Sequence, residues 1–95
     1  MKVLVIDSER TCLRVMRAPL ERDGYKVLAA RDGLSGLALV RSEVLGLVLL
    51  NVMPSGLDVC RQLRQISDVP VIMYGSPKPD DMVGALAAGA DNYVL

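Results

Sequence analysis

Three short apolar runs restrict the fold of this chain more than any other feature of its sequence. They are Val3–Ile6, Leu47–Leu50 and Val71–Met73, and none alternates apolar with polar residues as a half-exposed strand does. Unbroken apolar runs of this length are typical of parallel strands covered on both faces. Two weaker candidates are Lys26–Ala30 and Asn92–Leu95. We therefore expect a parallel five-stranded sheet between layers of helices.

Segments with a helical spacing of apolar residues separate these strands. Apolar positions recur every three or four residues in the ranges 13–20, 34–40, 59–66 and 82–90. Strands and helices thus alternate, which by the right-handed crossover rule places helices on both faces of the sheet. Pro19 lies inside the first helical range, where it removes one backbone hydrogen bond, and we expect a kink there. Residues 1–95 are long enough for one domain.

The composition excludes several classes of function. Eleven Lys and Arg balance eleven Asp and Glu, so no net positive charge favours nucleic acid or a membrane surface. The absence of His excludes imidazole catalysis and His-ligated zinc. No apolar run approaches the roughly 20 residues that span a bilayer. Cys12 and Cys60 lie in separate helical ranges without a CxxC spacing, which favours a reduced, cytoplasmic chain.

Polar residues follow three of the expected strands. The run Asp7-Ser8-Glu9 follows the first strand, Asn51 ends the third, and Gly75-Ser76 follows the fourth. Functional groups of an open parallel sheet collect beyond the carboxyl ends of its strands, so we expect these residues to form a small polar pocket. An alternative needs no ligand: Ser8 caps the first helix and Glu9 complements the helix dipole.

The order and spacing of these segments resemble a response-regulator receiver domain (CheY-like) along the whole chain. The resemblance lies in Lys2–Asp7, Asp23–Tyr25, Asp32-Gly33, Leu47–Asn51, Pro70–Met73 and Gly89–Tyr93. It implies an α/β, flavodoxin-like, doubly wound sheet of strand order 2-1-3-4-5, here truncated after the fifth strand and without the fifth helix. It also implies regulation, not enzymatic catalysis. Receivers accept a phosphoryl group from a histidine kinase on an Asp ending the third strand, beside Mg²⁺ held by acidic residues after the first.

When the family's functional positions are carried over to this sequence one by one, most of them hold a different residue type. Asn51 stands at the phosphoacceptor position, and an amide is too poor a nucleophile to form an acyl phosphate. The acidic pair becomes Asp7 and Ser8, with Glu9 as a partial substitute. Metal binding should therefore be absent, or weak with Asp7 as its one candidate ligand, because Mg²⁺ requires anionic oxygens. Gly75 replaces the hydroxyl residue, and neighbouring Ser76 could serve only if the loop shifts.

Two further positions bear on the resemblance. Tyr93 matches the aromatic switch of the last strand, and the alternative is an ordinary strand residue with an exposed hydroxyl. The loop Asn51–Gly56 is shorter than is usual in the family. A shorter loop should draw the following helix inward and narrow the pocket.

These expectations describe an atypical receiver of bacterial two-component signalling that acts by protein–protein contact without normal Asp phosphorylation. Its expected partners are a histidine kinase, a fused output domain, or a second copy. The second copy would bind through the sheet face that lacks a helix, or through the helix at 82–90 and the last strand. One alternative is a phosphorylatable receiver that uses Asp7 or Ser8 as acceptor and controls a DNA-binding output domain.

A third hypothesis is a small flavodoxin-like binder of flavin or nucleotide. Such proteins bring backbone N–H groups against a phosphate after the first strand, often with the help of glycine. The run Ser8–Thr11 has no glycine and places Glu9 where an anion would bind. The sequence therefore disfavours this hypothesis.

Overall fold

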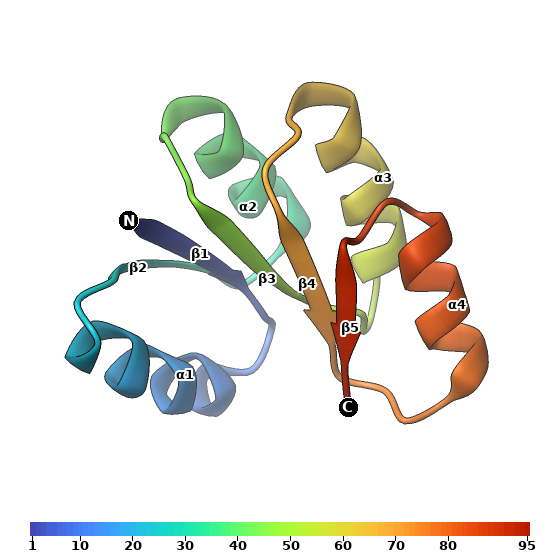
Figure 1. The fold of residues 1–95 in the computed structure, drawn as a ribbon, viewed down its shortest axis with the longest axis horizontal. Coiled ribbons are helices and arrows are strands. Elements are labelled where there is room, and N and C mark those ends of the chain that lie inside the picture. The colour runs from blue at the N-terminus through green and yellow to red at the C-terminus, as the bar shows by residue number, and fades with distance from the viewer.

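The computed structural model describes all residues from 1 to 95 and contains alternating strands and helices (Figure 1). The strands are β1 (Lys2–Ile6), β2 (Lys26–Ala30), β3 (Leu47–Asn51), β4 (Val71–Tyr74) and β5 (Asn92–Val94). The helices are α1 (Arg10–Arg22), α2 (Gly33–Ser42), α3 (Gly56–Ile66) and α4 (Pro79–Ala87). Every element lies where the apolar patterns predict it, with small differences at the ends.

The five strands form one parallel sheet of order β2-β1-β3-β4-β5, which confirms the expected fold class. The strand order reverses at β1, because the chain builds β2 on one side of it and then β3 on the other. A crevice is expected where the carboxyl ends of two such strands diverge. Ile6 pairs with Leu50, so the next residues, Asp7 and Asn51, are neighbours at this point.

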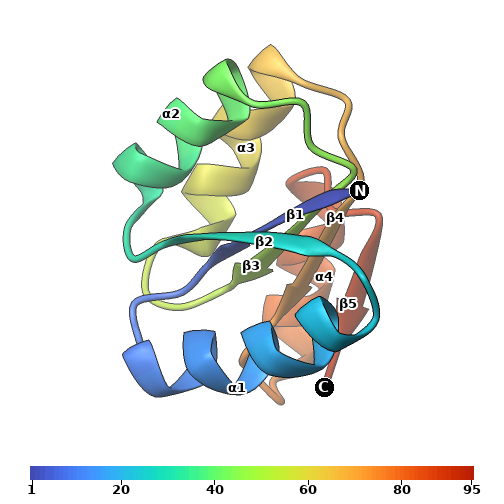
Figure 2. The same ribbon diagram turned by 90° about the vertical axis from the view of Figure 1, so that its left-hand side faces the viewer.

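The two faces of the sheet are covered unequally. Helices α2, α3 and α4 cover one face and α1 alone lies on the other, as Figures 1 and 2 show from two directions. The face under three helices holds a core of 16 buried residues, among them Leu4, Leu50 and Met73. The face under α1 holds three: Val3, Val5 and Val27.

Helix α1 runs without interruption through Pro19 to Arg22, so the proline lies inside a continuous helix (Figure 2). The physical reason is exposure. Proline removes the backbone bond to the carbonyl of Val15, and both residues lie on the solvent side, where water can satisfy that carbonyl.

The N-cap of α1 is Glu9 rather than Ser8, and its side chain makes no capping hydrogen bond. The alternative that Ser8 caps this helix is therefore wrong. No residue of α1 is fully buried, and the helix packs through the partly buried Leu13, Met16 and Leu20. No helix of the chain has both the length and the apolar character needed to cross a bilayer.

Candidate functional site

Asp7 is the buried centre of a polar cleft at the carboxyl end of the sheet, with only 2% of its surface exposed. Its Oδ1 accepts a hydrogen bond from the backbone N–H of Glu9 (2.9 Å). Its Oδ2 accepts two more, from Nδ2 of Asn51 (3.2 Å) and from the hydroxyl of Tyr74 (2.7 Å). A buried carboxylate is costly unless donors surround it. Here three neutral donors meet it.

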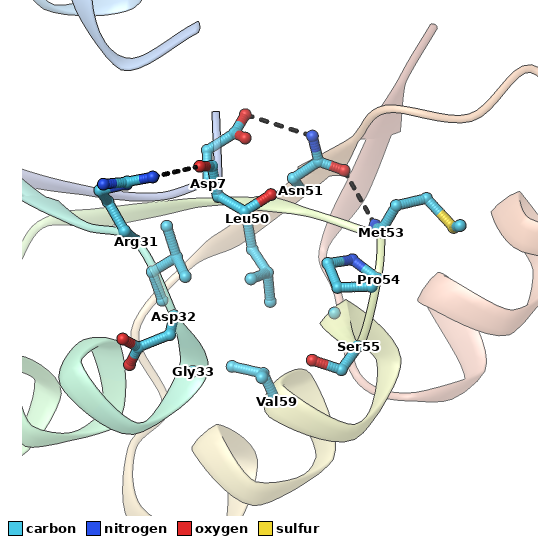
Figure 3. A pocket seen from close by; sticks show the side chains of 13 residues that line it. Asp7, Arg31, Asp32, Gly33, Leu50, Asn51, Met53, Pro54, Ser55 and Val59 are labelled. Carbon is cyan, nitrogen blue, oxygen red and sulfur yellow. Dashed lines mark hydrogen bonds between the residues drawn. The ribbon is translucent and has the colours of Figure 1, made fainter. Parts of the chain in front are cut away.

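The side-chain amide of Asn51 bridges Asp7 and the loop that follows β3 (Figure 3). Its nitrogen donates to Asp7, and its Oδ1 accepts from the backbone N–H of Met53 (2.8 Å). Both ends of the amide are thus engaged. The two partners also fix its orientation, because only the nitrogen can donate to a carboxylate and only the oxygen can accept from an N–H.

Two glycines allow Asn51 to fit. Gly75 has a φ of +110°, and a Cβ there would collide with Oδ1 of Asn51. Gly56, the first residue of α3, lies so close to the backbone carbonyl of Asn51 that a Cβ would collide with its oxygen. The first residue of α3 thus lies directly against the end of β3.

The open part of the cleft is a pocket of about 110 Å³ (Figure 3). Ser8 lies at its rim with an exposed side chain, and the Ser8 carbonyl accepts one long bond from Arg31 (3.4 Å). Asp32 also lines the pocket, but its carboxylate caps α2 by accepting from the N–H of Ser35 (2.7 Å). That bond holds the pKa of Asp32 below its usual value.

The residues of this cleft do not fit a bound Mg²⁺ ion. No three His, Cys, Asp or Glu side chains come close enough together to hold a metal. Asp7 already accepts hydrogen bonds on both oxygens, and Asn51 turns its nitrogen, not its oxygen, toward the carboxylate. A hard cation requires several oxygen ligands with negative charge among them. The donor set instead suits a carboxylate stabilised without a cation.

Ser76 and Tyr93 form a separate hydrogen-bonded unit outside the lining of this pocket. The Tyr93 hydroxyl donates to the Ser76 carbonyl (2.7 Å) and accepts from the Ser76 N–H (2.7 Å). The hydroxyl is thus buried and doubly bonded, so the alternative of an exposed one is wrong. Oγ of Ser76 donates to Asp81 (2.5 Å) and accepts from the N–H of Lys78 (3.2 Å). In this arrangement Ser76 does not replace the hydroxyl missing at Gly75.

Tyr74 is the residue of the cleft that sequence reasoning missed. It ends β4, its ring lies on the α1 side of the sheet, and its hydroxyl makes the shortest bond to Asp7. Burial, together with the bond to Asp7, raises the pKa of Tyr74 far above its usual value. The signal for it was the alternation of side chains along β4: Met73 belongs to the large core, so Tyr74 faces the other way.

Comparison with known proteins settles the family. Residues 3–95 match the response regulator receiver domain. The chain belongs to this family. Among curated relatives, the transcriptional regulatory protein CseB of Streptomyces coelicolor is 43% identical over 96 residues, which cover 97% of this chain and 41% of the relative. The chain thus spans about two fifths of the length of the curated relatives it matches.

Solved structures agree with this receiver fold. A CheY-like receiver domain protein from Methanospirillum hungatei has a TM-score of 0.90 at 26% identity, covering 98% of this chain and 78% of its own. A response regulator protein from Burkholderia pseudomallei, with a phosphorylated aspartic acid, calcium ion and citrate, also has a TM-score of 0.90 at 26% identity. That match covers 97% of this chain and 57% of the other.

Membership has general consequences for this receiver. Receiver domains are signalling regulators of two-component systems and not enzymes. They typically bind Mg²⁺ weakly, and related response regulators interact with kinases and output domains. The cleft around Asp7 differs from that general pattern in the side chains that it could offer to a metal ion.

Proposed function

We propose that this receiver is a pseudo-receiver, a signalling module that works through protein contacts and accepts no phosphoryl group on an Asp. The observation that supports it is the engagement of Asn51. Its amide nitrogen lies at the end of β3 and donates to Asp7, and its lone pair is delocalised, so it is no nucleophile. The cleft also lacks the anionic oxygens that would bring Mg²⁺ to a phosphodonor.

The substitute acceptors receive no support from the geometry. Asp7 is buried and both its oxygens accept hydrogen bonds, so an attack on phosphorus would first break this network. Ser8 is exposed, and no base accepts a hydrogen bond from its hydroxyl. A flavin or nucleotide is equally unsupported, because binding pockets for such ligands measure roughly 300–1,000 Å³ and this one about 110 Å³.

The proposed contact surface for a protein partner lies on α4 and β5. Val83 and Leu86 are large apolar side chains of α4 that remain exposed there. The paired bonds between Tyr93 and Ser76 hold β5 to the loop that precedes α4. We infer that this surface is presented in one conformation, without a phosphoryl group to select it. The proposed partners are a histidine kinase or an output domain in the same cytoplasmic regulator, since a curated relative is a transcriptional regulator.

A second copy of the chain is the proposed occupant of the other sheet face. Between α1 and the ends of β4 and β5 lies an apolar groove of about 380 Å³, lined by Thr11, Cys12, Val15, Met16, Tyr74, Val94 and Leu95. Val15, at the edge of this lining, has 67% of its surface exposed, so it can pack against the same groove of a second copy. The net charge of zero opposes no such pairing. Residues 1–95 would then act as one receiver domain whose open face a partner covers.

Phosphorylation is tested by incubating the protein with a small phosphodonor and Mg²⁺ and measuring its intact mass. We expect no increase, while a receiver that retains the phosphoacceptor Asp gains one phosphoryl group under the same conditions. A stable gain of one phosphoryl group in this protein would contradict the proposal. Asp7→Asn and Ser8→Ala would then identify the acceptor.

Association is tested by sedimentation at micromolar concentration. We expect a dimer for the unaltered protein, a monomer for Val15→Asp, and a dimer for the matched surface change Val83→Asp. Both valines are exposed, so neither change disturbs a core. A monomeric unaltered protein would rule out the dimer, and dissociation by Val83→Asp alone would move the interface to α4.

A further inference from the structure

Tyr74 belongs to two regions of the molecule at once. Its ring forms part of the apolar groove beside α1, and its hydroxyl reaches the buried carboxylate of Asp7. The hydroxyl bond, at 2.7 Å, is shorter than the two bonds that Asp7 receives from Asn51 and from the N–H of Glu9. A hydroxyl that donates to a carboxylate makes a charge-assisted bond, among the stronger kinds in proteins.

The hydrogen-bond donors around Asp7 stabilise its negative charge, as a bound cation stabilises a carboxylate in other sites. Oδ2 receives both the Tyr74 and the Asn51 bonds, so it is the more heavily engaged oxygen. A metal ion binding there would displace the Tyr74 hydroxyl from its acceptor. A partly buried hydroxyl without a partner costs free energy, so the bond opposes metal binding.

We propose that Tyr74 is an internal substitute for a divalent cation and that it keeps the cleft closed to such ions independently of Asn51. The proposal rests on the pseudo-receiver function and deepens it, because it assigns the loss of metal binding to a second residue. Restoring the carboxylate at position 51 alone would then be insufficient.

Restoring that carboxylate creates the pair that a cation would bridge. Nδ2 of Asn51 lies 3.2 Å from Oδ2 of Asp7, so Asn51→Asp places a second carboxylate beside Asp7. Such a pair attracts a cation because the ion relieves the repulsion. Tyr74 still donates to Oδ2 in this variant. Removing its hydroxyl with Tyr74→Phe frees the oxygen and preserves the ring that lines the groove.

The experiment measures Mn²⁺ and Mg²⁺ binding by calorimetry and by the shift in melting temperature. Asn51→Asp is compared with Asn51→Asp/Tyr74→Phe and with the control Asn51→Asp/Tyr25→Phe. Tyr25 packs against the small core under α1, and its hydroxyl makes no hydrogen bond with another residue, so the control removes a hydroxyl without freeing Asp7. Tyr74→Phe alone should bind neither ion, because the cleft keeps a single free carboxylate.

We expect the Tyr74 double variant to bind Mn²⁺ about tenfold more tightly than the other two, as about 1.4 kcal/mol of competing hydrogen bonding implies. Equal affinity in Asn51→Asp and Asn51→Asp/Tyr74→Phe would overturn the proposal. An equal gain in the Tyr25 control would also overturn it, because the effect would then come from general loosening.

A measurement on Asn51→Asp alone covers the case in which the double variant does not fold. The hydroxyl proton of Tyr74, held between two oxygens, should exchange slowly with water and give its own NMR signal. We expect Mg²⁺ to remove this signal at the concentrations where it binds. Mg²⁺ that binds while the signal persists unchanged would refute the competition. Phosphorylation of the unaltered protein would defeat the pseudo-receiver proposal and leave this comparison of affinities intact.

Discussion

At the scale of single residues, the residue types that form the cleft depend on one another. Asn51 points its amide oxygen toward the space above Gly75, where a side chain of any kind would collide with it. The amide cannot easily swing aside, because Asp7 and the N–H of Met53 hold its two ends. The amide of Asn51 in this position therefore requires a glycine at position 75.

Gly75→Ala tests this dependence. We expect the change to lower the free energy of unfolding by roughly 1–3 kcal/mol, since it combines a positive φ with a collision. In an Asn51→Ala background the cost should be smaller, because the colliding oxygen is gone and only the backbone strain remains. Urea denaturation of the four proteins measures both costs. Strictly additive costs would show that the two positions are independent.

At the scale of elements, one arginine ties three of them together. Arg64 of α3 donates to the carbonyls of Gly89 (2.8 Å) and Val69 (2.5 Å) and to the carboxylate of Asp91 (2.6 Å). The same carboxylate oxygen accepts from the N–H of Val71 at the start of β4 (2.8 Å). The end of α3 is thus fastened to the beginnings of β4 and β5.

Arg64→Ala should lower the free energy of unfolding by about 2–4 kcal/mol, because it leaves several acceptors of a partly buried cluster without their charged donor. Arg61→Ala is the matched control in the same helix. Its pair with Asp58 is exposed, and such pairs contribute less than about 1 kcal/mol. Urea denaturation measures the two variants side by side. Equal losses would mean that the network around Arg64 adds nothing beyond a surface ion pair.

At the scale of the whole molecule, stability is concentrated on one side of the sheet. Sixteen buried residues lie under α2, α3 and α4, against three under α1. Helix α1 has no fully buried residue, no capping side chain and an internal proline. Local opening follows the number of buried contacts, so α1 should open before the rest.

Native-state hydrogen exchange tests this distribution. In dilute solution the amides of α1 should exchange faster than those of α3 and the central strands. If a second copy covers the open face, the protection of α1 should rise with protein concentration while that of α3 stays constant. Protection of α1 equal to that of α3 at every concentration would contradict the unequal division of the core.

The sequence by itself determined the architecture. Strands covered on both faces must be apolar at every position, and helices that cover them must repeat every three or four residues, so Val3–Ile6 or Leu47–Leu50 shows its place directly. It also placed Asp7 and Asn51 at the same edge of the sheet, because parallel strands bring their carboxyl ends to one edge.

Only the tertiary structure decided which side chains form hydrogen bonds with one another. Tyr74 is 67 residues from Asp7 in the chain, and the two residue types do not by themselves predict the hydrogen bond between them. Arg64 and the carbonyl of Gly89 are likewise 25 positions apart. A hydrogen bond requires a donor–acceptor distance that is correct within a few tenths of an ångström and a donor angle that is close to linear. Such precision arises when the packed core fixes the backbone, whereas periodicity specifies only which face a residue occupies.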